Sequence, residues 1–328
     1  MILDELYHPI QDELDAVENT LKASLSESSS ESVLEMSDSV LACVGKRLRP
    51  ALVILSAKVS ENKADTESER DELIRIAAAF ELIHIASLIH DDLVDHAAIR
   101  HNRPTVNSRW GRDVSVIFGD YVYSKAFELI AERRNPDIFS CICQAVLVMC
   151  QGELNQLCQR DNIQLSRDSY IVIVKKKTAS IFTACCQAGT IISKQTGVVQ
   201  KALMEFGHDF GMAFQVADDY KDITGKGIGK PAGQDIAVGE MTLPLMNLLD
   251  TVSSEDKKRL ETLLASQPDA ETVRYIRELF LDSPARAKTR QIITYYVESA
   301  KKKLNHLGYC PYKQSLRRLA DYVVESIA

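Results

Sequence analysis

Long stretches of this chain repeat apolar residues at helical spacing, and few turn-forming residues interrupt them. Glycine (14) and proline (9) together make up about 7% of the 328 residues, against a usual share of about 12%. A β-sandwich or an α/β barrel of this size needs a tight turn roughly every ten to fifteen residues, built mostly from Gly, Pro, Asn and Asp. The scarcity of glycine and proline therefore favours few, long helices and an all-α fold.

The helical segments follow one another with short polar connections. The segment 72–95 is apolar nearly all round, as expected of a helix at the centre of a bundle. Ser28 and Glu31 have the spacing of a capping box for the next helix. The sequence shows no internal repeat, linker or strand run, which predicts a large single-domain helical bundle over residues 1–328. The predicted helices cover 2–23, 51–59, 72–95, 105–133, 137–158, 169–194, 197–222, 241–249, 255–265, 270–281, 285–304 and 313–327.

Charge and cysteine content exclude several classes of protein. The formal net charge is −7, so no global basic field exists for nucleic acid or an anionic membrane. No basic, apolar leader begins the chain, and the longest uncharged stretches, 138–152 and 178–193, fall short of the roughly 18–20 residues of a membrane span. The eight cysteines contain no CxxC pair and lie mostly in apolar helical runs. We expect reduced thiols and a cytoplasmic protein.

Two aspartate clusters with the same spacing stand at the ends of apolar runs. In each cluster the outer aspartates are four residues apart, so on a helix they share a face. Carboxylates in such a position need a compensating cation, and all-oxygen ligation favours Mg²⁺, which shares its remaining sites with phosphate oxygens. Two such faces opposing each other would bracket a diphosphate. The predicted metal ligands are Asp91, Asp92 and Asp95 in the first cluster, and Asp218, Asp219 and Asp222 in the second.

Basic residues gather in three places that could bind anions. Residues 45–50 (GKRLRP) carry three positive charges just before a predicted helix, whose first N–H groups also favour anions. Arg100, His101 and Arg103 follow the first aspartate cluster, and 175–177 are three lysines. A glycine-rich segment, 225–239, follows the second cluster and contains no Walker A pattern. For any single group a solvated surface would be an adequate explanation, but the set favours anion binding.

Together these pieces resemble the trans-isoprenyl diphosphate synthases, the polyprenyl synthetase family. The resemblance covers essentially the whole chain, with the pieces in the order of the family. It implies a helical bundle around a deep central cavity, and usually a homodimer. The matching pieces are GKRLRP at 45–50, LIHIASLIHDDLVD at 82–95, RPT at 103–105, KT at 177–178, FQVADDYKD at 214–222, GK at 229–230 and TLPL at 242–245.

The resemblance implies a reaction. An allylic diphosphate, such as farnesyl diphosphate, ionises, and its cation is attacked by isopentenyl diphosphate to give a product five carbons longer. It implies about three Mg²⁺ on the aspartates, which withdraw charge from the leaving diphosphate. It places isopentenyl diphosphate on Lys46, Arg49 and His84. It assigns the leaving diphosphate to Arg100, Lys230 and Lys177, and stabilisation of the cation to Lys177, Thr178 and Gln215, with Asp91 and Asp218 also counted as catalytic.

Two positions depart from the family pattern. The family usually has two arginines after the first cluster, whereas this chain has Arg100 and His101. The family often has Lys before its TLPL segment, where this chain has Glu240. Both changes remove positive charge near a diphosphate. We expect weaker binding of isopentenyl diphosphate, strengthening at lower pH if His101 protonates. Restoring arginine at position 101 is expected to lower the apparent KM.

Small residues before the first cluster bear on product length. Positions four and five before Asp91 lie about 6–7.5 Å along the helix from the metal site, where short-chain members of the family carry aromatic rings. Here they are Ser87 and Ala86, followed further down by Ile83 and Phe80. This predicts a long product, hexa- to decaprenyl diphosphate, with geranylgeranyl or farnesyl diphosphate as the alternative.

Two other functions fit the sequence less well. A terpene cyclase would lack GKxxRP and would replace the second aspartate motif. A non-catalytic subunit of a heteromeric prenyl synthase would tend to lose the aspartate motifs, and both are intact here.

Overall fold

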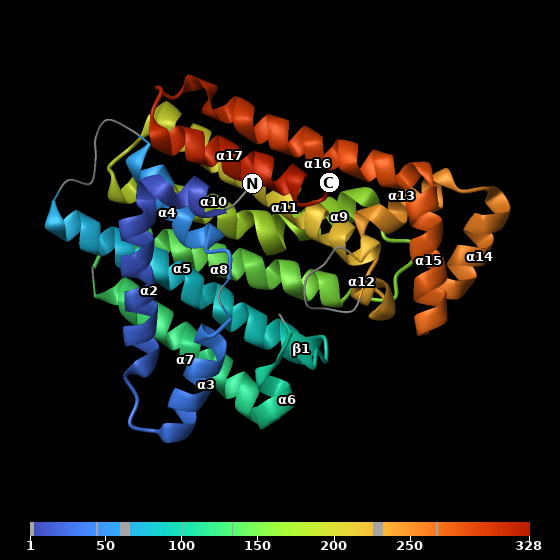
Figure 1. Ribbon diagram of the computed structural model, residues 1–328, viewed down its shortest axis with the longest axis horizontal. Helices are drawn as coiled ribbons and strands as arrows, with labels where there is room; N and C mark the ends of the chain where they lie inside the picture. Colours follow the sequence, from blue (N-terminus) through green and yellow to red (C-terminus); the bar gives the residue numbers. More distant parts are fainter. Residues whose placement is uncertain are drawn as a thin grey trace. The chain divides into compact units, whose positions relative to one another are not determined.

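The computed structural model describes residues 3–43, 45–59, 66–100, 102–132, 134–225, 232–266 and 268–328. Over these residues the regular structure is helical apart from one short hairpin (Figure 1). The predicted all-α class is confirmed. The helices are α1 Leu3–Tyr7, α2 Gln11–Ser26, α3 Glu31–Leu41, α4 Leu48–Lys58, α5 Glu67–Val94, α6 Val106–Trp110, α7 Arg112–Ala131, α8 Pro136–Leu157, α9 Arg167–Val174, α10 Ser180–Ile192, α11 Gly197–Thr224, α12 Gln234–Ala237, α13 Leu243–Thr251, α14 Ser254–Leu264, α15 Ala270–Asp282, α16 Pro284–Lys303 and α17 Pro311–Glu325.

The chain divides into two compact units. The first contains Met1–Cys143, Ala184–Met204 and Leu304–Arg318, and the second contains Gln144–Thr183, Glu205–Lys303 and Leu319–Ala328. Each unit is described by itself below. The prediction of one domain over residues 1–328 stays a prediction.

Helix α5 forms the centre of the first unit. It packs along α7 and also contacts α2 and α4 (Figure 1). Ile76, Phe80 and Ile83 of α5 are fully buried, as the apolar character of this segment on all sides predicts. A capping box starts the helix, in which the Thr66 side chain accepts from the N–H of Glu69 and the Glu69 carboxylate accepts from the N–H of Thr66.

Aromatic side chains form the core of the second unit. Phe206, Phe210 and Phe214 follow one another at four-residue spacing along α11, so they lie on one face of the helix. The ring of Phe182 packs against two of them, edge-on to Phe210 at 5.2 Å between centroids and tilted on Phe214 at 5.3 Å. In the same unit, α13 packs against α16, α15 and α9.

Several helix boundaries differ from the prediction. The first predicted helix is interrupted at Pro9 by a 3₁₀ turn, His8–Ile10, because proline lacks the N–H that a helix interior needs. The predicted helix 105–133 is split at Gly111, whose φ of +88° suits glycine. The predicted capping box of Ser28 and Glu31 is wrong, because α3 begins at Glu31 itself, after Ser30. The Ser28 hydroxyl instead accepts from the N–H of Ser30.

A short hairpin follows the first aspartate cluster, where no strand was predicted. Ile99 pairs with Pro104 and Arg100 with Arg103 in an antiparallel ladder. Strands of two residues carry no detectable alternation. The hairpin fixes the backbone on which Arg100 stands.

All eight cysteines lie in described residues, and none forms a disulfide. Cys141, Cys185 and Cys186 are buried, whereas Cys150 and Cys158 are exposed. Burial raises the pKa of Cys141 and of Cys186 to about 12, so these thiols are inert core side chains.

By length and composition alone, α5 and α8 could cross a membrane. In α5, 67% of the most apolar stretch is buried inside the protein, which its place in the core explains; in α8 the share is 33%. Two such helices are weak evidence for a membrane protein.

Candidate active site

The first aspartate cluster lies at the C-terminal end of α5. Asp95 is the C-cap residue, and its N–H donates to the carbonyl of Asp91 at 2.8 Å. Asp91 and Asp95 therefore stand one above the other on a helical turn, as predicted. Carboxylates at a helix C-terminus face the negative end of the macrodipole, which costs about 0.3–1 kcal/mol each. A divalent cation would remove that cost, and carboxylate oxygens are the ligands that such ions prefer. Among the described residues, no three His, Cys, Asp or Glu side chains are gathered closely enough to hold a metal ion by themselves.

Asp92 has a different role from its two neighbours. Its side chain is 8% exposed and accepts from Nε of Arg100 at 2.7 Å. Its backbone carbonyl accepts from the N–H of Ala97. Asp92 therefore positions the guanidinium of Arg100 next to the first cluster.

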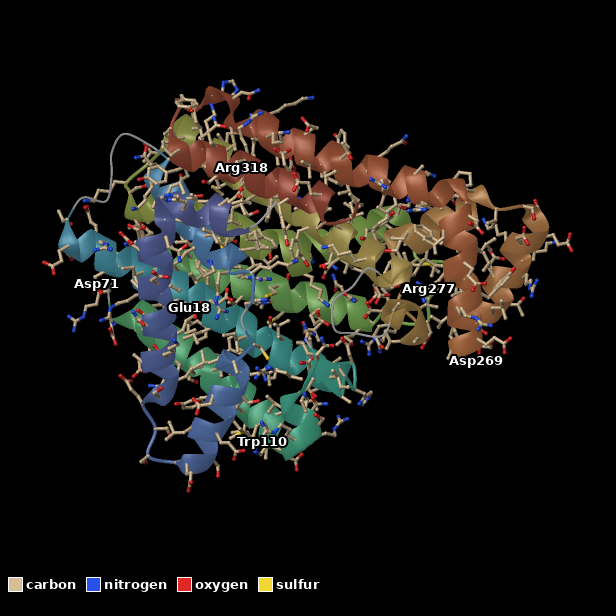
Figure 2. The ribbon with its side chains drawn as sticks, viewed as in Figure 1. Glu18, Asp71, Trp110, Asp269, Arg277 and Arg318 are labelled. Carbon is tan, nitrogen blue, oxygen red and sulfur yellow. The ribbon has the colours of Figure 1, made fainter. Side chains whose placement is uncertain are left out.

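The cation-bearing loop, residues 45–49, is held by an ion triad in which Arg47 and Glu81 are buried and Glu18 is half-buried. Arg47 adopts a left-handed backbone conformation, with φ at +51°. Its guanidinium donates to both carboxylate oxygens of Glu18 on α2, labelled in Figure 2, and through Nη1 to Glu81 of α5 at 2.8 Å. The Arg47 and Glu81 side chains are only 10% and 4% exposed. Burial lowers the pKa of Arg47, but the two glutamates more than offset it and raise that pKa overall.

This triad changes how the three positive charges of GKRLRP are used. The Arg47 guanidinium pairs with two carboxylates of the protein, so Arg47 is not a third anion-binding group. Lys46 stays exposed, and its carbonyl accepts from the hydroxyl of Tyr7 at 2.6 Å. Arg49 lies half-buried in the first turn of α4, and His84 half-buried on α5. Both belong to the first unit, like the first aspartate cluster.

The second aspartate cluster occupies the last two turns of α11. The Asp218 side chain is 57% exposed, with Nζ of Lys221 at 3.8 Å. Nε of Arg277, labelled in Figure 2, donates to the carbonyl of Ile223 at 3.1 Å and so offsets the negative end of the helix. Asp218 and Asp222 are four residues apart within the helix, as predicted.

The remaining carboxylates of the second cluster hold other groups. Asp219 is 5% exposed and accepts from the hydroxyl of Tyr170 and from Nε2 of Gln215. Burial raises its pKa to about 7, although both hydrogen bonds act in the opposite direction. The two oxygens of Asp222 accept from the backbone N–H groups of Gln234 and Asp235, each at 3.1 Å. Asp222 thus anchors the chain at the start of α12.

Lys177 and Thr178 lie in a single turn of π-helix, Lys175–Ala179, between α9 and α10. Such turns are rare and often mark functional sites. Nζ of Lys177 contacts Glu153 of α8 at 2.6 Å, and the Thr178 hydroxyl donates to Oε1 of Gln215 at 2.6 Å. The turn brings together the predicted residues Lys177, Thr178 and Gln215.

Two glycines allow neighbouring helices to approach this π turn closely. A Cβ added to Gly152 of α8 would lie 2.3 Å from the backbone nitrogen of Lys177. A Cβ added to Gly211 of α11 would lie 2.7 Å from Cα of Ala179. Any larger residue at either position must therefore displace backbone.

The negative charge of Glu240 is compensated by donor groups of the second unit. Its carboxylate accepts from the side chain of Gln156 and from Nη2 of Arg160, the latter at 3.3 Å. The sequence alone suggests that Glu240 leaves a local deficit of positive charge, but Arg160, in the turn that follows α8, supplies a cation there. His101, Lys230 and most of the glycine-rich segment lie outside the described residues.

Comparisons with known proteins give the family of this chain. A family model described as polyprenyl synthetase matches residues 30–280. The chain belongs to the polyprenyl synthetase family.

Relatives of this chain differ in the product that their names indicate. The chain is 30% identical to the short chain isoprenyl diphosphate synthase of Methanothermobacter thermautotrophicus, over 93% of this chain and 94% of that protein. It is also 30% identical to heptaprenyl diphosphate synthase component 2 of Geobacillus stearothermophilus, over 98% of each. The family assignment makes the protein a prenyltransferase, without fixing the length of its product.

A solved structure supports the fold and the type of ligand. A polyprenyl synthase from Caulobacter crescentus, complexed with calcium and isoprenyl diphosphate, superimposes with a TM-score of 0.91 at 29% identity, over 98% of this chain and 97% of that chain. That relative contains calcium and isoprenyl diphosphate, which is consistent with divalent metal binding in this family.

Sequence reasoning missed the residues that position the site. Tyr170, Glu153 and Glu81 lie far in sequence from the groups they contact, and no local spacing indicates such partners. Gly152 carries a weak signal, because a glycine inside a predicted helix without a capping role suggests a close approach.

Proposed function

We propose that this prenyltransferase condenses isopentenyl diphosphate with an allylic diphosphate such as farnesyl diphosphate, head to tail and in the trans configuration, and that it requires Mg²⁺. The observation that carries the proposal is the pair of aspartate clusters, each with outer carboxylates four residues apart near the C-terminal end of a long helix. Such carboxylates are poorly placed without a divalent cation.

Asp91, Asp95 and Asp218 are the proposed metal ligands. Asp92, Asp219 and Asp222 support them, since each already accepts hydrogen bonds within the protein. Bound Mg²⁺, about three ions by family resemblance, withdraws charge from the leaving diphosphate as a Lewis acid.

The basic groups divide between the two substrates. Lys46, Arg49 and His84, with His101, bind isopentenyl diphosphate, which needs cations from the protein because it carries no metal. Arg100, oriented by Asp92, holds the leaving diphosphate together with Lys230 and Lys177.

The π turn supplies oxygen dipoles for the developing allylic cation. The Lys177 carbonyl, the Thr178 hydroxyl and Oε1 of Gln215 are fixed oxygens that stabilise positive charge as it forms. The diphosphate that leaves accepts the proton lost from the condensed intermediate.

The direct test is incubation with Mg²⁺, isopentenyl diphosphate and farnesyl diphosphate, followed by sizing of the dephosphorylated products. We expect elongated products, abolished by a chelator and restored by added Mg²⁺. A folded protein that elongates no allylic primer contradicts the proposal.

A long product, hexa- to decaprenyl diphosphate, is the proposed outcome. Ala86 is small and, like Ile83 and Phe80 below it on α5, fully buried. The alternative is geranylgeranyl or farnesyl diphosphate, with Phe80 closing the space for the tail. Ala86→Phe is expected to shorten the product, whereas an unchanged product would show that the tail takes another path.

We also propose a cytoplasmic homodimer. On α7, Ile117 is 68% exposed, Val116 42% and Val114 37%, an apolar surface of the kind that marks protein contacts. A second, different subunit is the alternative, since one relative is named as component 2 of its synthase. The mass of the purified chain in solution tests this point, and activity of the chain alone excludes an obligatory second component.

A further inference from the structure

Four polar side chains form a continuous hydrogen-bond chain in the second unit. The Tyr170 hydroxyl donates to Oδ2 of Asp219, and Nε2 of Gln215 donates to Oδ1 of Asp219 at 2.8 Å. The Thr178 hydroxyl donates to Oε1 of Gln215 at 2.6 Å. Tyr170, Thr178 and Asp219 are all buried, so water does not substitute readily for these partners.

The chain of hydrogen bonds fixes which way the Gln215 amide points. Both oxygens of Asp219 accept hydrogen bonds, Oδ2 from the Tyr170 hydroxyl and Oδ1 from the NH₂ group of Gln215. The carbonyl oxygen, Oε1, is therefore turned toward Thr178. If the amide were reversed, a donor would face Thr178, and oxygen would face the carboxylate.

The same contacts also tie the π turn to α11. Tyr170 lies in α9 before the turn, and Thr178 lies within it. Their partners, Asp219 and Gln215, are four residues apart and so share one face of α11. One contact lies before the π turn and the other lies within it, and together they hold the register of the turn against α11.

We propose that Tyr170 is a positioning residue of prenyl transfer, which acts through Asp219 to hold Oε1 of Gln215 and the π turn in the orientation that stabilises the allylic cation. This inference rests on the proposed function. A group that acts on the developing cation changes kcat more than substrate binding. Loss of the Tyr170 hydroxyl therefore lowers kcat while both KM values stay nearly constant.

The test is a double-mutant cycle on the full chain with Mg²⁺, isopentenyl diphosphate and farnesyl diphosphate. Tyr170→Phe removes one hydroxyl and is expected to lower kcat about tenfold. Gln215→Leu removes the oxygen itself and is expected to lower kcat about 100-fold. Adding Tyr170→Phe to Gln215→Leu is expected to cause no further loss, because the residue through which Tyr170 acts is gone.

A matched control is Tyr220→Phe. Tyr220 is a fully buried tyrosine of α11, and its hydroxyl accepts from Nε of Arg286 at 3.3 Å, away from Gln215. This variant is expected to keep the wild-type kcat. Melting temperatures of all variants confirm that they are folded.

The inference is overturned by an unchanged kcat in Tyr170→Phe, or by an equal loss of kcat when Tyr170→Phe is added to the wild type and to Gln215→Leu. A shift in the Mg²⁺ concentration for half-maximal rate that accounts for the loss of kcat overturns it as well. An unchanged kcat in Gln215→Leu alone also overturns it, which keeps the test valid if phenylalanine at 170 disturbs folding. A wild-type protein without prenyl transfer refutes the proposed function instead, so the two failures are distinguishable.

Discussion

The cation-bearing loop of the first unit and the π turn of the second present polar groups in different ways. Residues 45–49 are fixed by charge, because the buried guanidinium of Arg47 joins Glu18 and Glu81. The π turn is held by hydrogen bonds to α11 and by close packing, because Gly152 and Gly211 let two helix backbones come close to it. The first region depends on ion pairs, whereas the second depends in addition on two positions that carry no side chain.

The difference predicts different responses to substitution. A buried ion triad is costly when one partner is removed, because the remaining charge stays desolvated. Apolar residues of similar volume can replace the whole set at little cost. No other residue can replace a glycine at such a contact without a cost in stability, because any Cβ occupies space that backbone atoms already fill.

The largest expected effect follows removal of Arg47. Arg47→Met leaves Glu81 buried without its cation, and Oε2 of Glu81 already has no hydrogen-bond partner among the described residues. We expect the free energy of unfolding to fall by about 3–5 kcal/mol. Urea denaturation followed by circular dichroism measures this change.

Two comparisons sharpen that measurement. Arg109→Met breaks an exposed pair with Glu35, with side chains 40% and 59% exposed, and should cost at most about 1 kcal/mol. A triple variant that replaces Arg47, Glu18 and Glu81 by Met, Leu and Leu should recover most of the loss. Equal stability of Arg47→Met and Arg109→Met would show that burial of the triad contributes little.

The next effect compares the two aspartate clusters. Mg²⁺ at 100 times its dissociation constant should stabilise the protein by about 2.7 kcal/mol. Asp91→Asn is expected to remove most of that gain. Asp222→Asn should instead lower stability by about 1–2 kcal/mol equally with and without Mg²⁺, because Asp222 anchors the backbone N–H groups of Gln234 and Asp235. Thermal unfolding across a Mg²⁺ titration separates the two outcomes, and identical behaviour of both variants would contradict the distinction.

The sequence predicted helices and acidic clusters well, for a local physical reason. The spacing of Asp91 and Asp95, or of Asp218 and Asp222, survives in any helix, and so does the apolar character of α5. The roles of Asp219 and Arg47 were not predictable, because their partners Tyr170 and Glu81 are distant in sequence. The partner of Asp92, Arg100, is near in sequence but stands on a two-residue strand that leaves no sequence pattern. Glu240 shows the same limit, since its cation Arg160 lies eighty residues away. Residue type and spacing indicate what a site binds, whereas long-range contacts decide which member of a motif is exposed to a ligand.

Disturbing the Gly152 contact should cost less stability than removing Arg47, and its main effect should be on activity. Gly152→Ala places a methyl group against the backbone of Lys177, so α8 or the π turn must move. We expect a cost of about 1–3 kcal/mol in stability and a loss of roughly tenfold or more in kcat, because the oxygen groups of the turn are displaced. Gly308→Ala is the control, since nothing lies within 4 Å of a Cβ there. Wild-type kcat in Gly152→Ala would show that the close approach has no catalytic consequence.

The smallest expected effect follows a change of charge at Glu240, which pairs with Arg160. Glu240→Lys restores the residue common in the family but places it against Arg160, whose side chain is 23% exposed. Repulsion between the two cations should cost about 1 kcal/mol or less, and any improvement in diphosphate binding should be small. The second variant, Glu240→Lys with Arg160→Glu, restores an ion pair of opposite orientation and should recover stability. A Glu240→Lys protein that binds isopentenyl diphosphate tenfold more tightly at unchanged stability would show that Arg160 does not compensate Glu240, and that the family lysine acts independently of this pair.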